Sequence, residues 1–227
     1  MFEIDSDNFS MKLAKVKLAY SGNGNDYNFD GVESVSIDNK SDEDIKSALT
    51  DSDLVFIIAG VQTLNVAKIA KEIGALTVAI VEKEIKSSDI DTFFVVDDKN
   101  KSIFQNIIKS ISDLIAVPGL INLDVTDVKD ILGNAGRAYS GTGEAENTTD
   151  PVKNAIKSVD GNISNSKSLL LNLLGATDGL SMMEVNDAAT ALQEAVNEDA
   201  EIIWGVSIEE SLGDKIIATV IAARCDE

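Results

Sequence analysis

The chain has 227 residues, with 19 lysines and arginines against 39 aspartates and glutamates, a net charge of −20, one cysteine and no histidine. The lack of histidine excludes Ser-His-Asp and Cys-His catalysis and histidine-ligated zinc, and the single Cys225 excludes an intrachain disulfide or a thiolate metal cage. The negative charge argues against nucleic acid or an anionic membrane as a partner, because both would repel it.

The first half of the chain alternates apolar runs with helical patterns. Residues 54–59 form a continuous apolar run that Gly60 ends, typical of a strand covered on both faces. Residues 66–73 follow with helical spacing, and 76–81 form a second buried strand, so this order predicts a right-handed parallel crossover. The other expected elements of this half are strands at 15–19, 35–37 and 93–96 and a helix at 42–49.

The clearest helix covers residues 102–115, where isoleucine and leucine recur on one wide stripe, and Pro118-Gly119 ends it. The second half reads as an α+β block with a mixed or antiparallel sheet. Its expected elements are a helix at 125–132, a strand at 138–140, a loop at 141–145, a helix through Val159 with Asp150 as its N-cap and Pro151 as its first residue, a strand at 168–174, a helix at 183–196, and strands at 202–206 and 216–222.

These elements predict three parts with a boundary near Val117. Residues 1–98 form an α/β domain with a parallel sheet, 99–116 a central connecting helix, and 117–227 an α+β domain with a mixed sheet. The longest apolar runs are too short to span a bilayer and the acidic start is not a secretory signal, so we expect a cytoplasmic protein without direct membrane binding.

Residues 118–129, PGLINLDVTDVK, lead a loop into a helix that carries Asn122, Asp124 and Asp127. From the residues alone, an ordinary N-terminal cap with acids favoured by the helix dipole is the commoner explanation, and a catalytic role is the alternative.

Residues 111–132, ISDLIAVPGLINLDVTDVKDIL, resemble the central helix and synergy loop of FtsZ, the bacterial tubulin homologue. The segments GVESVSID, DSDLVFIIAG and AKEIGALTVAIVEK are similar to three strand regions of its nucleotide domain. GTGEA, MMEVNDAA and AEIIWGVSIEESLGDKIIATVIAA are similar to its C-terminal half. The resemblance is collinear and covers nearly the whole chain after Lys12. It implies a reduced tubulin/FtsZ-type, Rossmann-like N-terminal domain and an FtsZ-type C-terminal domain.

In FtsZ the synergy loop enters the GTP pocket of the next subunit and positions the attacking water, so hydrolysis needs two subunits. The resemblance places Asn122, Asp124 and Asp127 on its Asn-x-Asp-x-x-Asp pattern, as candidate catalytic residues that act in trans on a partner's nucleotide. Phosphoryl transfer depends mainly on positioning and charge placement, so carboxylates can serve without histidine.

The receiving half of the site departs from the family. Where FtsZ has the phosphate loop AG-x-GGGTGTG, whose backbone N–H groups cradle phosphates, this chain has AGVQTLN at 59–65. The turn after the first strand is reduced to SGNGN at 21–25, and the acidic position that reads guanine falls near Ser102. Residual candidates for nucleotide binding are Gly22, Gly24 and Gly60. No lysine or arginine replaces the lost donors, so we expect no bound cofactor. No spacing unites the acids at Asp97-Asp98 and Glu209-Glu210, so we expect no metal site.

These features predict an FtsZ-like protein, related to cell division, that does not bind GTP and is not an enzyme on its own. It would regulate or cap filaments of FtsZ or another tubulin-like subunit through its synergy-loop face. One alternative is a minimal, self-assembling GTPase that uses GTP and Mg²⁺, and the other is a nucleotide-independent homo-oligomer. The sequence ends just after the last strand, so we expect no FtsZ-type tail peptide for membrane adaptors.

Overall fold

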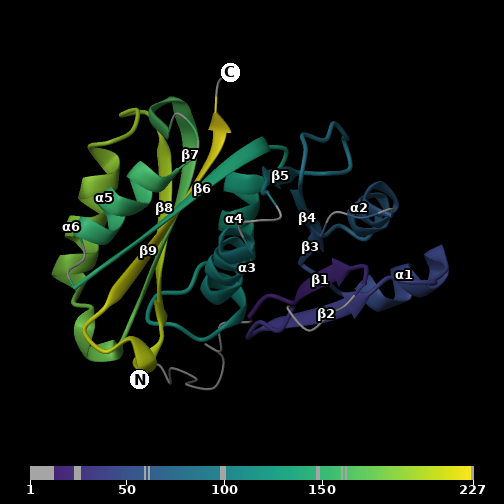
Figure 1. Ribbon diagram of the computed structural model, residues 1–227, viewed down its shortest axis with the longest axis horizontal. Coiled ribbons are helices and arrows are strands. Elements are labelled where there is room, and N and C mark those ends of the chain that lie inside the picture. Colours follow the sequence, from purple (N-terminus) through teal and green to yellow (C-terminus); the bar gives the residue numbers. More distant parts are fainter. Residues whose placement is uncertain are drawn as a thin grey trace, which may run out of the picture.

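The computed structural model describes residues 13–22, 27–58, 60, 62–97, 101–146, 149–159, 161 and 163–225. One nine-stranded sheet runs through both halves of the molecule, in the order β2-β1-β3-β4-β5-β6-β9-β7-β8 (Figure 1). The expected α/β architecture, with a parallel first half, a central helix and a mixed second half, is therefore confirmed.

The first half of the sheet is parallel throughout. Its buried strands are the continuous apolar runs of the sequence, because helices cover both faces. The strands are β1 (Val16–Tyr20), β2 (Val32–Ser36), β3 (Leu54–Ile58), β4 (Leu76–Val81) and β5 (Thr92–Val95). The helices α1 (Asp42–Leu49) and α2 (Thr63–Glu72) pack on one face through a cluster that includes Ile45 and Val66.

The central helix α3 (Lys101–Ala116) packs on the opposite face, and Figure 1 shows it between the two halves. Its apolar stripe, with Ile107, Ile111 and Leu114 fully buried, contacts strands from both halves of the sheet. Ile103 departs from the expected stripe, because 40% of its surface stays exposed.

The second half has a mixed sheet, as expected: β6 and β7 pair antiparallel with β9, and β7 pairs parallel with β8. Helices α5 and α6 cover its outer face, whereas α3 and α4 lie on the inner face. The elements are α4 (Val125–Leu132), β6 (Gly136–Ala145), α5 (Thr149–Ser158), β7 (Ser166–Gly175), α6 (Met182–Gln193), β8 (Glu201–Ile208) and β9 (Ile216–Cys225).

The prediction of a loop at 141–145 is wrong, because these residues continue β6 to Ala145. Glycines at 141 and 143 suggested a turn, but they serve close packing. A Cβ at Gly141 or Gly143 would lie 2.2 Å from a backbone oxygen of α5, that of Ala155 or Pro151. The helix itself begins at Thr149, so Asp150 lies in its first turn rather than at the cap.

A parallel pairing of β5 with β6 joins the two halves of the sheet. The chain leaves the sheet after β5 as α3 and returns beside β5 as β6, so one sheet crosses both expected domains. Among the described residues, no helix is long and apolar enough to cross a membrane.

Candidate functional site: the loop between α3 and α4

The loop that joins α3 to α4 is held by the side chain of Asn122. Its Oδ1 accepts a hydrogen bond from the N–H of Gly119 at 2.9 Å, and its Nδ2 donates to the carbonyls of Val117 at 2.7 Å and Leu114 at 3.1 Å. Leu114 lies in the last turn of α3, where backbone acceptors lack partners within the helix, and Val117 follows directly after the helix. Asn122 therefore caps the helix and closes the loop at once.

Strand β8 fixes the other side of this loop. The N–H groups of Leu120 and Ile121 donate to the carbonyl of Val206 at 2.9 and 3.1 Å, and the N–H of Val206 donates back to Ile121 at 2.9 Å. The backbones meet so closely that a Cβ at Gly119 would lie 2.6 Å from the Val206 oxygen. The loop conformation is thus fixed within the subunit, before any partner binds.

The two carboxylates of the candidate site are exposed. Asp124 is the N-cap of α4: its Oδ1 accepts from the N–H of Thr126 at 2.7 Å, and this bond holds the pKa of its carboxyl below the usual range. Asp127 lies in the first turn of α4, and within the described residues nothing hydrogen-bonds to its carboxylate. The cap interpretation of Asp124 is confirmed, and Asp127 is the group free to act outside the subunit.

A buried acid near this loop was missed in the sequence. Asp113 of α3 is only 3% exposed, and its carboxylate lies 2.9 Å from Nζ of Lys109. Burial raises the pKa of Asp113, while Lys109 acts in the opposite direction. An acid four residues after a lysine, inside an apolar helical stripe, was the signal available for it.

The loop and the expected nucleotide loops lie at opposite ends of the parallel strands. The central helix starts beyond the carboxyl end of β5 and ends beside the start of β1, where the N–H of Ala14 donates to the carbonyl of Ile115 at 2.8 Å. The candidate glycines follow β1 and β3, at the carboxyl edge of the sheet. The molecule therefore has two different end faces.

At the carboxyl edge, the two described candidate glycines already have hydrogen-bond acceptors. The N–H of Gly22 donates to the carboxylate of Asp38 at 2.7 Å, and the N–H of Gly60 donates to Oγ1 of Thr63 at 2.8 Å. The third candidate, Gly24, lies outside the described residues. Carboxylate oxygen at one of these positions places negative charge where a phosphate would need a donor.

Aromatic side chains lie between the end of β1 and the first turns of α3. The ring centres of Tyr20 and Tyr27 are 4.8 Å apart, and those of Tyr27 and Phe104 are 6.0 Å apart. Ser102, the position that the resemblance implies for guanine recognition, is exposed and lies two residues before Phe104 on α3. Among the described residues, no three acidic or thiol groups gather closely enough to hold a metal ion.

Residues 136–226 match the family model for the C-terminal domain of the FtsZ family. Two solved FtsZ structures from M. jannaschii, an empty dimer and a mutant, are each 23% identical to the chain. The dimer match covers 93% of this chain and 88% of that chain with a TM-score of 0.78, and the mutant match covers 94% and 92% with a TM-score of 0.80.

A third match is TubZ of Bacillus thuringiensis serovar israelensis, solved as GDP-form protofilaments. It is 10% identical, covers 94% of this chain and 84% of that chain, and has a TM-score of 0.60. The chain therefore has the FtsZ fold. This fold, together with the family match of residues 136–226, supports a relationship to the tubulin/FtsZ superfamily.

Proposed function

We propose that this FtsZ-like protein binds no GTP of its own and caps filaments of FtsZ or of another tubulin-like subunit. Its synergy-loop face would dock on the nucleotide-bearing face of the terminal subunit. The contrast between the two end faces carries the proposal: the loop face is fixed and presents Asp127, whereas the described glycine N–H groups of the opposite face are already engaged.

A head-to-tail contact between two different faces extends without limit when every subunit carries both faces. A subunit that keeps the loop face but offers no nucleotide at the other end stops this growth. The Tyr20–Tyr27–Phe104 cluster and the Asp38 carboxylate both support the loss of the nucleotide face. The cluster places apolar groups between β1 and α3, and Asp38 places a negative group against the N–H of Gly22.

Charge favours a different protein, rather than a second copy, as the partner. Asp124 and Asp127 on one end face would meet Asp38 and Asp42 on the other end face of an identical subunit, with no surplus of cations to offset them. In a partner that holds nucleotide with bound Mg²⁺, the metal ion would lie at the contact and offset part of the phosphate charge there, which an identical subunit without nucleotide would not provide. The same carboxylates could then orient water for hydrolysis of the partner's nucleotide.

The test measures FtsZ sedimentation and phosphate release with GTP, after adding this protein at well below one molecule per FtsZ. Capping predicts shorter polymers at these low ratios, and docking through the loop predicts that Asp127→Ala removes the effect. Asp187→Ala, which changes an exposed acid on the remote helix α6, is the matched control and should act like the wild type. No change in sedimentation or phosphate release, or an unaltered effect with Asp127→Ala, would contradict the proposal.

Two further measurements separate the alternatives. Calorimetry with GTP and Mg²⁺ should show no binding, and micromolar binding would favour the self-assembling GTPase. Light scattering of the purified protein without nucleotide should show a monomer, and larger species would favour the homo-oligomer.

A further inference from the structure

A cavity of about 520 Å³ lies where the continuous sheet divides. The ladder between β5 and β6 ends at the pair Phe94–Ala138, and beyond it β6 runs on beside β9 while β5 leads to Asp97. Strands that part at the carboxyl edge of a parallel sheet leave a crevice, and α/β folds bind ligands in such crevices. The volume falls within the range of small-molecule sites, roughly 300–1,000 Å³.

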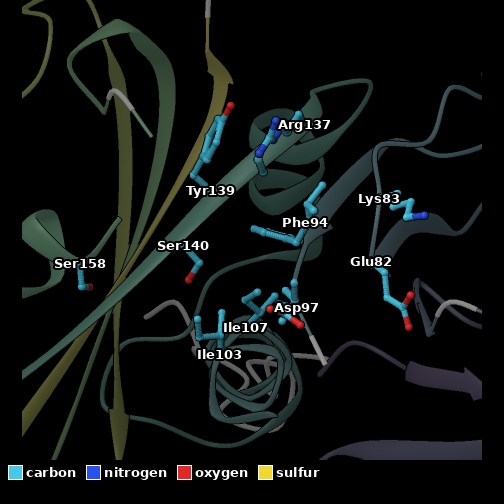
Figure 2. Close-up of a pocket in the computed structure, with 13 residues that line it drawn as sticks. Glu82, Lys83, Phe94, Asp97, Ile103, Ile107, Arg137, Tyr139, Ser140 and Ser158 are labelled. Atoms are coloured by element: carbon cyan, nitrogen blue, oxygen red, sulfur yellow. The ribbon is translucent and has the colours of Figure 1, made fainter. Parts of the chain in front are cut away.

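The floor of this cavity is apolar. Phe94, Ile107 and Ala138 are at most 2% exposed, and Ile103 stands at its rim with 40% exposure. Figure 2 shows the Phe94 ring, the two isoleucines and the Ser140 hydroxyl facing the same space. Within the described part of the chain, Ser140 Oγ has no hydrogen-bond partner, so the floor offers a surface for an apolar body beside one free hydroxyl.

A guanidinium stands at one end of the cavity. Arg137 lies with its Cζ 4.8 Å from the centre of the Tyr139 ring, and no carboxylate of the described residues forms an ion pair with it. Figure 2 shows Glu82 and Asp97 toward the other end, away from Arg137. An arginine that forms no ion pair within the described residues is unusual in a chain of net charge −20. Guanidinium binds planar anionic groups through paired hydrogen bonds.

We propose that this cavity binds a small anionic amphiphile, with a flat apolar body against Phe94, Ile103 and Ile107 and an acidic group on Arg137. The acidic group would be a carboxylate, sulfonate or phosphate. The site is separate from the expected nucleotide loops, because its described lining includes none of Gly22, Gly60 and Ser102. It is also independent of the capping function.

The test uses two fluorescent probes that share one ring system, anilinonaphthalene sulfonate and the uncharged phenylnaphthylamine. Both should bind the folded wild-type protein saturably, at one site per chain. Arg137→Gln should weaken the sulfonate probe by about tenfold and leave the uncharged probe unchanged, because only the charge-assisted bond is lost. Ile103→Asn should weaken both probes, since it makes the rim polar.

Two variants serve as matched controls. Lys68→Gln changes an exposed cation on α2, and Met183→Asn changes an exposed methionine on the remote helix α6, so both should bind the probes like the wild type. Circular dichroism of each variant establishes that it is folded. Three results would overturn the proposal. Arg137→Gln could bind the sulfonate probe as tightly as the wild type, Ile103→Asn could bind both probes as tightly as the wild type, or the wild type could show no saturable binding of either probe.

Discussion

Asn122 gives the sharpest test of how the synergy loop is built. The resemblance to FtsZ assigns this residue to catalysis across a subunit contact, yet its amide makes three hydrogen bonds within 3.1 Å inside its own subunit. At about 1 kcal/mol for each bond, Asn122→Ala should lower the free energy of unfolding by roughly 2–3 kcal/mol. Asp127→Ala removes an exposed side chain and should change it by less than about 0.5 kcal/mol.

Urea unfolding monitored by tryptophan fluorescence suits this measurement. Trp204 is the only tryptophan, and it lies on β8 two residues before Val206, to which the loop is bonded. Asn122→Asp is an informative second variant: it keeps the acceptor for Gly119 but turns a carboxylate toward the carbonyl end of α3. It should therefore unfold at lower urea than Asn122→Ala at neutral pH. If Asn122→Ala is as stable as the wild type, the loop is not held by this side chain and the reasoning fails.

Four other predictions concern stability and association. Asp91 is 3% exposed and accepts hydrogen bonds from Lys71, Thr77 and Asn134, so Asp91→Ala should cost about 3–5 kcal/mol in a urea titration. Burial raises the pKa of Asp91, but these hydrogen bonds together hold it below its usual range, so the unfolded chain takes up the proton first. In thermal unfolding at several pH values, the stability lost in Asp91→Asn should therefore shrink as the pH falls through the usual range of an aspartate. Gly143→Ala should destabilise the protein by about 2 kcal/mol or more, because the new Cβ would meet a backbone oxygen of α5. Ser140→Ala, on the opposite face of β6, is the control and should cost less than about 1 kcal/mol. Equal urea unfolding midpoints for the two variants would contradict this packing. Any self-association seen in sedimentation velocity should increase with salt, because screening weakens the repulsion between acidic end faces, and a decrease with salt would show attraction instead.

Much of the fold was predictable because apolar periodicity follows burial. The helices at 42–49 and 125–132 and the strand at 76–81 have the bounds expected from the sequence. The strand through Gly141 and Gly143 was not predictable from local sequence. Those glycines are needed because α5, which comes later in the chain, packs closely against them. The pairing of β5 with β6 was likewise not predictable, because it joins strands that are about 40 residues apart in the sequence and leaves no local pattern.

The candidate site divides in the same way. Asp124 as an N-cap followed from its place before a helical pattern. The internal bonds of Asn122 did not, because they join residues across the turn between two helices. The Asp38 contact with Gly22 and the Thr63 contact with Gly60 depend on how the loops at the strand ends fold. The sequence therefore suggested that glycines of the phosphate loop are lost, but not which side chains accept hydrogen bonds from the N–H groups of the remaining ones.

The pairing of β5 with β6 makes the two halves of this chain depend on each other during unfolding. Among the described residues, the pairs Thr92–Gly136, Phe93–Arg137 and Phe94–Ala138 connect the two parts of the backbone ladder, and α3 packs on one face of the last of these pairs. Neither half can open without exposing that short seam to solvent. In hydrogen exchange, the amides of the seam should therefore exchange only with the slowest, global opening of the molecule, and the two halves should behave as one cooperative unit.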